Sequence, residues 1–386
     1  MRNKNHELIF VDRIKDMRRI VFLSLFCLIY TILVFTLLSE IIPEKNFFPY
    51  RNVALEYASE RWARFANFDG VHYISIARSG YSEFQQAFFP AYPVLIRFIS
   101  FVFGDNFFWA GVFLSWLALF LGAVIWYRFL KNFLKKEPFD ILLFWLIFPT
   151  SFFFFSVYTE SLFFLILGVV LYSLQKRKFI IFFLSLFFLS LTRVVGVVAV
   201  LIVFFSKGLS WRQKILGIIF SLSGIGLYSL YLFKTTGDPL FFFNAQNVFG
   251  ARSTKLVFLL QVYFRYLKIF LTADFSFAYI IALFEFVVFN WVFLFFVYMA
   301  IKKKLYVFWR GFSLEKGIFY FSLASIIIPT LTGTFYSIPR FVLLSPYFFI
   351  YFPQKLYGRL KLFLYCLAFL GYTVFAVFFA RGYFVS

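Results

Sequence analysis

The sequence predicts an all-α polytopic membrane protein. Of its 386 residues, 63% are hydrophobic and 14% are charged, and the mean hydropathy is +0.87. Long apolar runs recur along the whole chain, which suits a bilayer, where helices satisfy their own backbone hydrogen bonds. The net charge of +21 does not indicate a nucleic-acid partner, because Lys and Arg lie in short clusters between apolar runs, as in cytoplasmic loops.

The apolar runs predict about eleven transmembrane helices in a single domain, residues 1–386. In chain order we place them at residues 20–42, 107–128, 139–157, 160–175, 179–193, 195–206, 215–233, 276–301, 315–333, 338–353 and 361–380. Basic clusters at 176–178 and 302–304 predict the cytoplasmic side, so the N-terminus is expected in the cytoplasm. The first run is too long for a cleaved signal peptide and is expected to be a retained signal anchor.

Two long segments, 43–106 and 234–275, are expected on the outer face, where they carry juxtamembrane helices. The first contains an amphipathic piece at 53–66 and a polar island at 67–93. Residues 88–103 are apolar but short and hold two prolines, so we interpret them as a re-entrant or interfacial helix. Counting them as a span would move the basic clusters that follow to the outer face, against the usual charge bias.

The island holds Asp69 in an Asp-Gly turn beside aromatic residues. An acid kept just outside a first span usually serves chemistry or ligand binding, and an ionised carboxylate there can take the proton of an acceptor hydroxyl. The alternative is that Asp69 only caps the following helix. His72 is expected to pack or to hydrogen-bond, because no second His lies nearby to complete a zinc site.

Three further polar residues interrupt the apolar pattern. Glu160 lies in a tight turn before a span, where it could orient an acceptor, or it could simply favour the helix start. Arg193 and Arg340 lie between apolar runs and need partners. A lipid phosphate matches the guanidinium fork, and an internal pair with a carboxylate such as Glu160 or Asp238 is the alternative.

Two further acidic residues, Asp238 and Glu285, each allow two interpretations. Asp238 belongs to Gly-Asp-Pro-Leu at 237–240, with Asn244 and Gln246 close behind, which predicts a turn opening an outer interfacial helix, or loop architecture alone. Glu285 lies within a span, where it is either a buried structural acid with a polar neighbour or part of a transport path.

Several motifs occur together in one order. They are AFFPAYP at 87–93, FPTSFFFFSVYTES at 148–161, LTRVVG at 191–196, GDPLFFFNAQ at 237–246 and SIPRFVLLSPYF at 337–348. With the Asp-bearing island, this arrangement resembles the bacterial relatives of the PIG-V-type mannosyltransferases, a family of GT-C membrane glycosyltransferases. The resemblance covers roughly residues 60–350, and the AFFPxYP and YTES pieces are its most specific parts.

The resemblance implies a GT-C fold and transfer of a sugar, usually mannose, from a polyprenyl-phosphate carrier on the outer face of the bacterial inner membrane. It implies that the acidic residues Asp69 and Glu160 belong to the catalytic site, with Asp69 as the base, and that Arg193 and Arg340 bind the carrier phosphate. The family motif commonly has Trp where Phe68 precedes Asp69. The candidates for substrate binding are His72, Tyr73, Tyr81, Tyr158, Asp238 and Gln246.

No cofactor is required by this chemistry, although Asp69 and Glu160 could share a divalent cation. The expected partners are the polyprenyl-phosphate-linked sugar, an acceptor that the sequence does not specify, and the lipid bilayer. The alternatives are a lipid-linked saccharide flippase or transporter, a scaffold subunit, and a GT-C enzyme for another sugar such as glucose or arabinose. A transporter predicts charged residues along a path through the spans, whereas here they cluster at span ends, with Glu285 the main exception.

Overall fold

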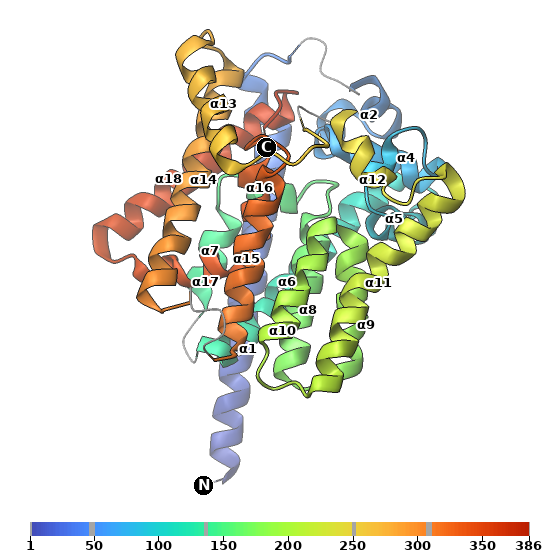
Figure 1. Ribbon diagram of the computed structural model, residues 1–386. Helices are drawn as coiled ribbons and strands as arrows, with labels where there is room; N and C mark the ends of the chain where they lie inside the picture. The colour runs from blue at the N-terminus through green and yellow to red at the C-terminus, as the bar shows by residue number, and fades with distance from the viewer. Residues whose placement is uncertain (1, 46–50, 135–137, 249–251, 306–310, 386) are drawn as a thin grey trace.

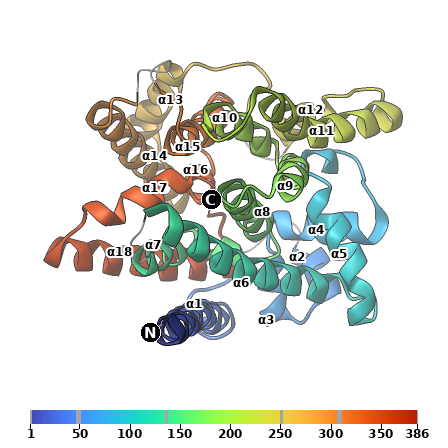
Figure 2. The same cartoon turned by 90° about the horizontal axis from the view of Figure 1, so that it is seen from below.

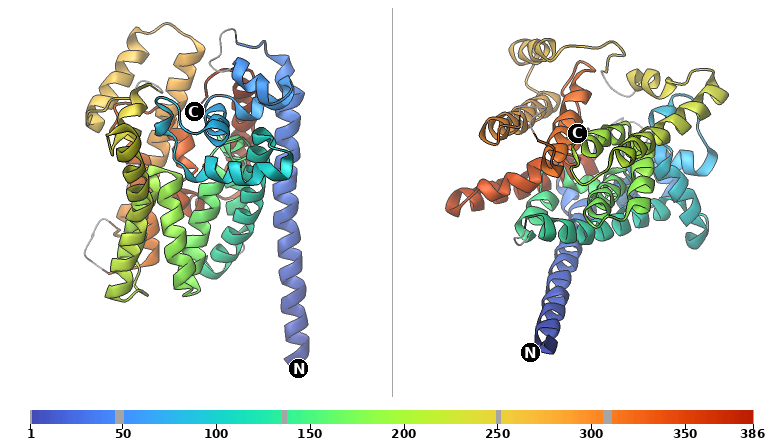
Figure 3. Two further views of the ribbon diagram at one scale, coloured as in Figure 1. Left: turned by 90° about the vertical axis from the view of Figure 1, so that its right-hand side faces the viewer. Right: turned by 60° about the horizontal axis from the view of Figure 1, so that its bottom comes forward.

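The computed structural model describes residues 2–45, 51–134, 138–248, 252–305 and 311–385. Within these ranges the secondary structure is entirely helical. Long helices run side by side through the body of the molecule, and most of the short helices gather at the end opposite the N-terminus (Figure 1). The first helix, α1 (Arg2–Thr36), extends beyond the bundle at its N-terminal end (Figure 3).

Five helices in the described part of the chain are long and apolar enough to cross a membrane. They are Arg18–Ile41, which begins within α1, α6 (Phe107–Leu134), α11 (Trp211–Thr236), α14 (Phe277–Lys302) and α18 (Gly358–Ala380). Each coincides with a span expected from an apolar run. The class of helical membrane protein is therefore confirmed, while the number of spans supported by helix length is five rather than eleven.

The other expected spans are shorter helices packed between the long ones. They are α8 (Glu160–Gln175), α9 (Phe179–Thr192), the 3₁₀ helix η6 (Val194–Ala199) with α10 (Val200–Phe205), and α15 (Leu314–Thr330). Helix α8 packs between α6 and α9, and α9 packs on α11 (Figure 2). A Cβ at Gly224 of α11 would lie 2.3 Å from the Phe187 carbonyl oxygen, so only glycine permits this approach of α11 to α9.

Two expected spans are not continuous helices. In the segment 139–157, helix α7 (Phe139–Leu146) ends before Pro149 and a 3₁₀ turn, η5 (Ser151–Phe154), follows. In the segment 338–353, α16 (Ile338–Val342) and α17 (Pro346–Tyr351) are separated before Pro346. A proline disfavours helical backbone at the residue before it. The resulting irregular backbone is buried in protein, which is the condition for tolerating it at membrane depth.

The two expected outer segments form the short helices at the end opposite the N-terminus (Figures 1 and 3). These are α2 (Arg51–Tyr57), α3 (Glu60–Ala63), α4 (Asp69–Ser79), α5 (Ala91–Ser100), α12 (Phe241–Asn244) and α13 (Leu259–Thr272). Helix α5 has ten residues, too few to span a bilayer, and its Phe98 side chain is exposed. Its length agrees with the re-entrant or interfacial interpretation. The basic turn at 176–178 between α8 and α9 lies at the opposite end (Figure 1).

Candidate functional site

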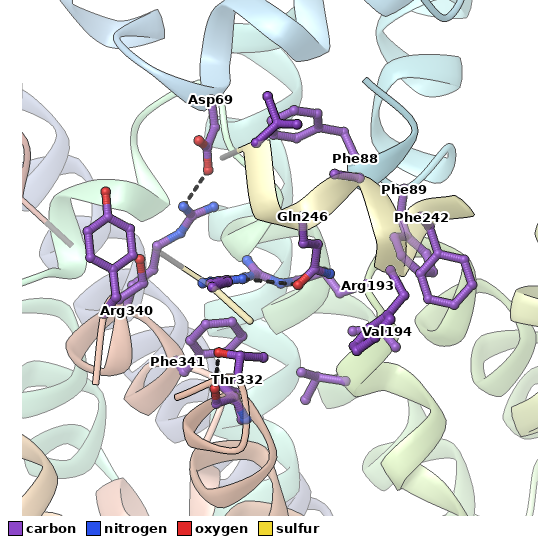
Figure 4. A pocket seen from close by; sticks show the side chains of 18 of the residues that line it. Asp69, Phe88, Phe89, Arg193, Val194, Phe242, Gln246, Thr332, Arg340 and Phe341 are labelled. Atoms are coloured by element: carbon purple, nitrogen blue, oxygen red, sulfur yellow. Dashed lines mark hydrogen bonds and ion pairs between the residues drawn. The ribbon is translucent and has the colours of Figure 1, made fainter. Parts of the chain in front are cut away.

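A pocket of 710 Å³ lies among the short helices. Its walls come from α4, from the segment leading into α5, from the start of η6, from α12 and the residues after it, and from the stretch between α15 and α16 (Figure 4). Segments far apart in the sequence therefore meet around one cavity. Six of the predicted site residues line it: Asp69, His72, Tyr73, Arg193, Gln246 and Arg340.

Asp69 faces the pocket and is paired with Arg340. It is the first residue of α4, and its side chain is 29% exposed. Arg340 Nη1 donates a hydrogen bond of 2.6 Å to Asp69 Oδ2 (Figure 4). Burial raises the pKa of Asp69, but the charge and the hydrogen bond of Arg340 lower it by more. This pKa therefore lies below its usual value. Asp69 is ionised at neutral pH, and its side chain binds an arginine instead of only capping the helix.

Glu160 lies behind the pocket wall, between two arginines. Its side chain is fully buried, and its Oε1 accepts hydrogen bonds from Arg193 Nη1 and Arg340 Nε. Arg193 also donates to Thr159 Oγ1 at 3.1 Å. The internal pairing considered for the two arginines is thus realised with Glu160. The exposed fractions of the arginine side chains are 14% for Arg193 and 10% for Arg340, and both reach the pocket that Glu160 does not line.

The backbone before Asp69 adopts an unusual conformation. Phe68 has φ 58° and ψ −115°, which is rare for a bulky residue and is held only where the surroundings determine it. Its ring packs against Phe379 at 5.7 Å and Phe384 at 5.2 Å between centroids. Contacts from the C-terminal part of the chain therefore fix the turn that presents Asp69.

The island and the YTES turn are joined by close backbone contacts. A Cβ at Gly70 would lie 3.2 Å from the Val157 carbonyl oxygen, so glycine allows α4 to approach this turn. The Val157 N–H donates to the carbonyl of Phe65 at 2.8 Å. Tyr158 Oη donates to the carbonyl of Asn67 at 2.7 Å. Asp69 and Glu160 consequently belong to one packed unit.

Glu285 anchors the segment that leads into Arg340. Its Oε1 accepts from the Ser337 N–H at 3.1 Å, and its Oε2 accepts from Tyr266 Oη at 2.9 Å. Tyr266 Oη in turn accepts from the Phe335 N–H at 3.1 Å. Ser337 has φ 66°, a left-handed conformation that starts α16. Glu285 is therefore the paired structural acid that was one of its two interpretations.

The two predicted aromatic neighbours of Asp69 are uncharged. Burial lowers the pKa of His72, although the nearby Asp69 charge opposes this, and the imidazole stacks on Phe88 at 4.8 Å. Burial also raises the pKa of the Tyr73 hydroxyl to about 12. Both side chains can therefore offer hydrogen bonds to a ligand without adding charge to the pocket.

Three predicted substrate-binding residues lie outside the pocket lining. Tyr81 Oη donates to the carbonyl of Phe88 at 2.8 Å. Tyr158 is buried, with its ring centroid 4.6 Å from the guanidinium of Arg340. Asp238 accepts hydrogen bonds from the Leu240 N–H and from Asn244 Nδ2, at the turn that opens the short helix α12. Each of the three supports the architecture around the site, and none reaches the cavity.

The sequence interpretation missed several pocket residues, above all Arg252. It lines the cavity together with Lys45, Lys255 and Tyr336. Burial lowers the pKa of Arg252 to about 10, so it remains a cation at neutral pH. The available signal was the basic charge on the expected outer segment 234–275, where the charge bias of membrane proteins predicts few Lys and Arg.

The two acids are bridged by an arginine. Among the residues that the structure describes, no three His, Cys, Asp or Glu side chains gather where they could hold a metal ion. Asp69 and Glu160, which were expected to share a divalent cation if one is used, share the guanidinium of Arg340 instead.

Comparison of the chain with models of protein families finds no match, and searches of characterised proteins and of solved structures also find none. A function can therefore be proposed only from the pocket and the sequence motifs.

Proposed function

We propose that this protein is a membrane glycosyltransferase, with Asp69 as the general base, that transfers a sugar from a polyprenyl-phosphate carrier to an acceptor hydroxyl. The observation that carries the proposal is that Asp69, paired with Arg340, lies on the wall of a pocket that Arg193 also lines. Mannose is the expected sugar, because the motifs resemble those of mannosyltransferases. The outer face of a bacterial inner membrane is the expected location.

The composition of the pocket suits a donor with a charged group and an apolar chain. Its cationic side is formed by arginines, and much of its remaining wall is apolar, including Phe88, Val194 and Phe341. A phosphate can face the guanidinium groups while the lipid follows the apolar wall. The cavity also has a volume within the range typical of small-molecule sites.

The proposed reaction is a single displacement at the anomeric carbon. An acceptor hydroxyl beside Asp69 gives its proton to the carboxylate, and its oxygen forms the new bond to the sugar. The bond between the anomeric carbon and the phosphate oxygen breaks, and the electron pair leaves with the lipid phosphate. A positioned base typically contributes about 10²–10⁴-fold to the rate, and the arginines stabilise the charge that develops on the phosphate.

Transfer from radiolabelled polyprenyl-phosphate-mannose in membranes tests the proposal. Membranes with the wild-type protein should move label to an acceptor, and membranes with Asp69→Asn should not. Asp238→Asn is the matched control, because Asp238 lies outside the pocket lining. Wild-type transfer by Asp69→Asn would rule out this base. Absence of transfer by the wild-type protein with a full panel of donor sugars would rule out the enzyme.

A further inference from the structure

The charges of two pocket arginines are already balanced inside the protein. Arg340 pairs with both Asp69 and Glu160, and Arg193 pairs with Glu160. Two carboxylates thus face two guanidinium groups. An incoming anion would gain less from these arginines than from a cation that has no carboxylate partner, because it would compete with bonds that already exist.

Arg252 is such a cation. It lines the same pocket, and in the described ranges of the chain no carboxylate lies within ion-pair distance of it. Its Nη1 donates a long hydrogen bond of 3.4 Å to Gln246 Oε1. Its guanidinium lies 5.7 Å from the centroid of the Phe341 ring, and that of Arg193 lies 5.1 Å from the same centroid. Arg252 and Arg193 therefore lie around one ring at the pocket wall.

The backbone holds Arg252 in place. The N–H of the next residue, Ser253, donates to the Thr332 carbonyl at 2.8 Å, and the Val257 N–H donates to the Leu331 carbonyl at 2.8 Å. Leu331 and Thr332 line the pocket as well. A half-buried cation on an anchored segment, beside an apolar wall, is prepared for an anion attached to an apolar chain.

We propose that Arg252 is the principal contact for the phosphate group of the ligand, and that Arg193 and Arg340 mainly hold the two carboxylates in place. The identity of the ligand as a lipid-linked phosphate rests on the proposed function. The chemistry recognised by Arg252 is a phosphate ester, whether it belongs to a lipid or to a soluble molecule. Gln246 orients the guanidinium toward the cavity.

The test is equilibrium binding to the purified full chain in nanodiscs of zwitterionic lipid. The probes are a polyprenyl phosphate without sugar, the matching polyprenol and inorganic phosphate. The variants are Arg252→Gln, Arg252→Lys and the control Arg97→Gln, which removes an exposed arginine of α5 outside the pocket lining. Thermal unfolding of each variant shows that it is folded.

We expect Arg252→Gln to weaken binding of polyprenyl phosphate roughly 10- to 100-fold, the usual range for a lost hydrogen-bonded charge. Arg252→Lys should fall between Gln and wild type, because it keeps the charge and loses the fork. Polyprenol binding and the Arg97→Gln variant should be unaffected. Wild-type binding by Arg252→Gln would overturn the proposal and return the phosphate to Arg193 and Arg340.

The probes separate the two sources of phosphate and the two proposals. Tight, Arg252-dependent binding of polyprenyl phosphate alone supports a lipid ligand. Equally tight binding of inorganic phosphate supports a phosphate site to which the polyprenyl group contributes no affinity. No binding of either phosphate by the wild-type protein would overturn the site. Because the probes carry no sugar, Arg252-dependent binding without any transfer activity would exclude the transferase and leave the phosphate site intact.

Discussion

Arg340 Nη1 lies 2.6 Å from Asp69 Oδ2, across 271 positions of sequence. The same guanidinium donates through Nε to Glu160. One arginine thus connects the acid that faces the pocket with the acid buried behind it. The protonation of Asp69, its orientation and the stability of this wall all depend on that side chain.

The activity is expected to persist into mildly acidic solution. Burial raises the pKa of Asp69, but Arg340 lowers it by a larger amount, so the folded-state pKa lies below the ordinary value of about 3.9. A depressed pKa means that the ionised base, and the stability it contributes, is present above the ordinary value and is lost as pH falls through the folded value. The dependence of kcat/KM on pH should therefore show no loss from Asp69 down to about pH 4.

The variant Arg340→Gln checks the cause of this behaviour. It removes the opposing charge and leaves the burial of Asp69, so the acidic limb should move to higher pH. His72 faces the same acid and can titrate in this range, and the His72→Asn variant separates its contribution. An acidic limb at the same pH with and without Arg340 would contradict the role assigned to this arginine.

Replacing Glu160 by Gln should destabilise the folded protein strongly. The change leaves Arg193 and Arg340 buried with one carboxylate fewer, and loss of one partner of a buried ion pair typically costs about 3–5 kcal/mol. Thermal unfolding in detergent measures the effect. Glu83→Gln, at an exposed acid, is the control. Equal stability of the two variants would show that Glu160 is not the counter-ion of the arginines.

Tyr266→Phe is expected to loosen the segment that precedes Arg340. The change removes the acceptor of the Phe335 N–H and a donor to Glu285, and a buried group left without its partner costs about 1–3 kcal/mol. The free energy of unfolding and the rate of transfer should both fall. The neighbouring Tyr263→Phe, whose hydroxyl bonds Asn290 instead, should leave the rate unchanged. Equal rates in both variants would contradict this anchoring.

Gly70→Ala tests the contact between the island and the YTES turn. The added Cβ would lie 3.2 Å from both Ala66 Cβ and the Val157 carbonyl oxygen, and overpacking of this kind costs about 1–3 kcal/mol. Gly226→Ala on α11 is the matched control, since beyond its own stretch of helix backbone no atom lies within 4 Å of the added Cβ. We expect the first variant to unfold at a lower temperature and the second to be as stable as the wild type or more so.

The helical class and the long spans could be predicted because apolar length is a local property of the sequence. The runs at 107–128 and 276–301, for example, become α6 and α14 with small changes at their ends. The segments 139–157 and 338–353 were equally apolar, and their prolines were the signal that the helices break. Apolar length by itself does not tell a helix long enough to cross a bilayer from the shorter or broken helices that the other six runs form.

The site could be predicted only in part. The motifs identified Asp69, Arg193 and Arg340, which all reach the pocket. That Glu160 lies behind the wall could not be predicted, because its position depends on contacts with Arg340, 180 residues away. The place of Arg252 in the pocket depends likewise on the pairing of its neighbour Ser253 with the segment after α15.

The separation of Glu160 from its two arginines has a consequence for synthesis of the chain. At about 5–20 residues per second, the ribosome reaches Arg340 roughly 9–36 s after Glu160, which is 180 positions earlier. Arg193 follows after only 33 positions. Because an unpaired carboxylate is costly in a membrane, the nearer arginine would be its counter-ion while the nascent protein is inserted. Arg193 would then keep the Glu160 carboxylate paired until Arg340, in the C-terminal third of the chain, has been synthesised.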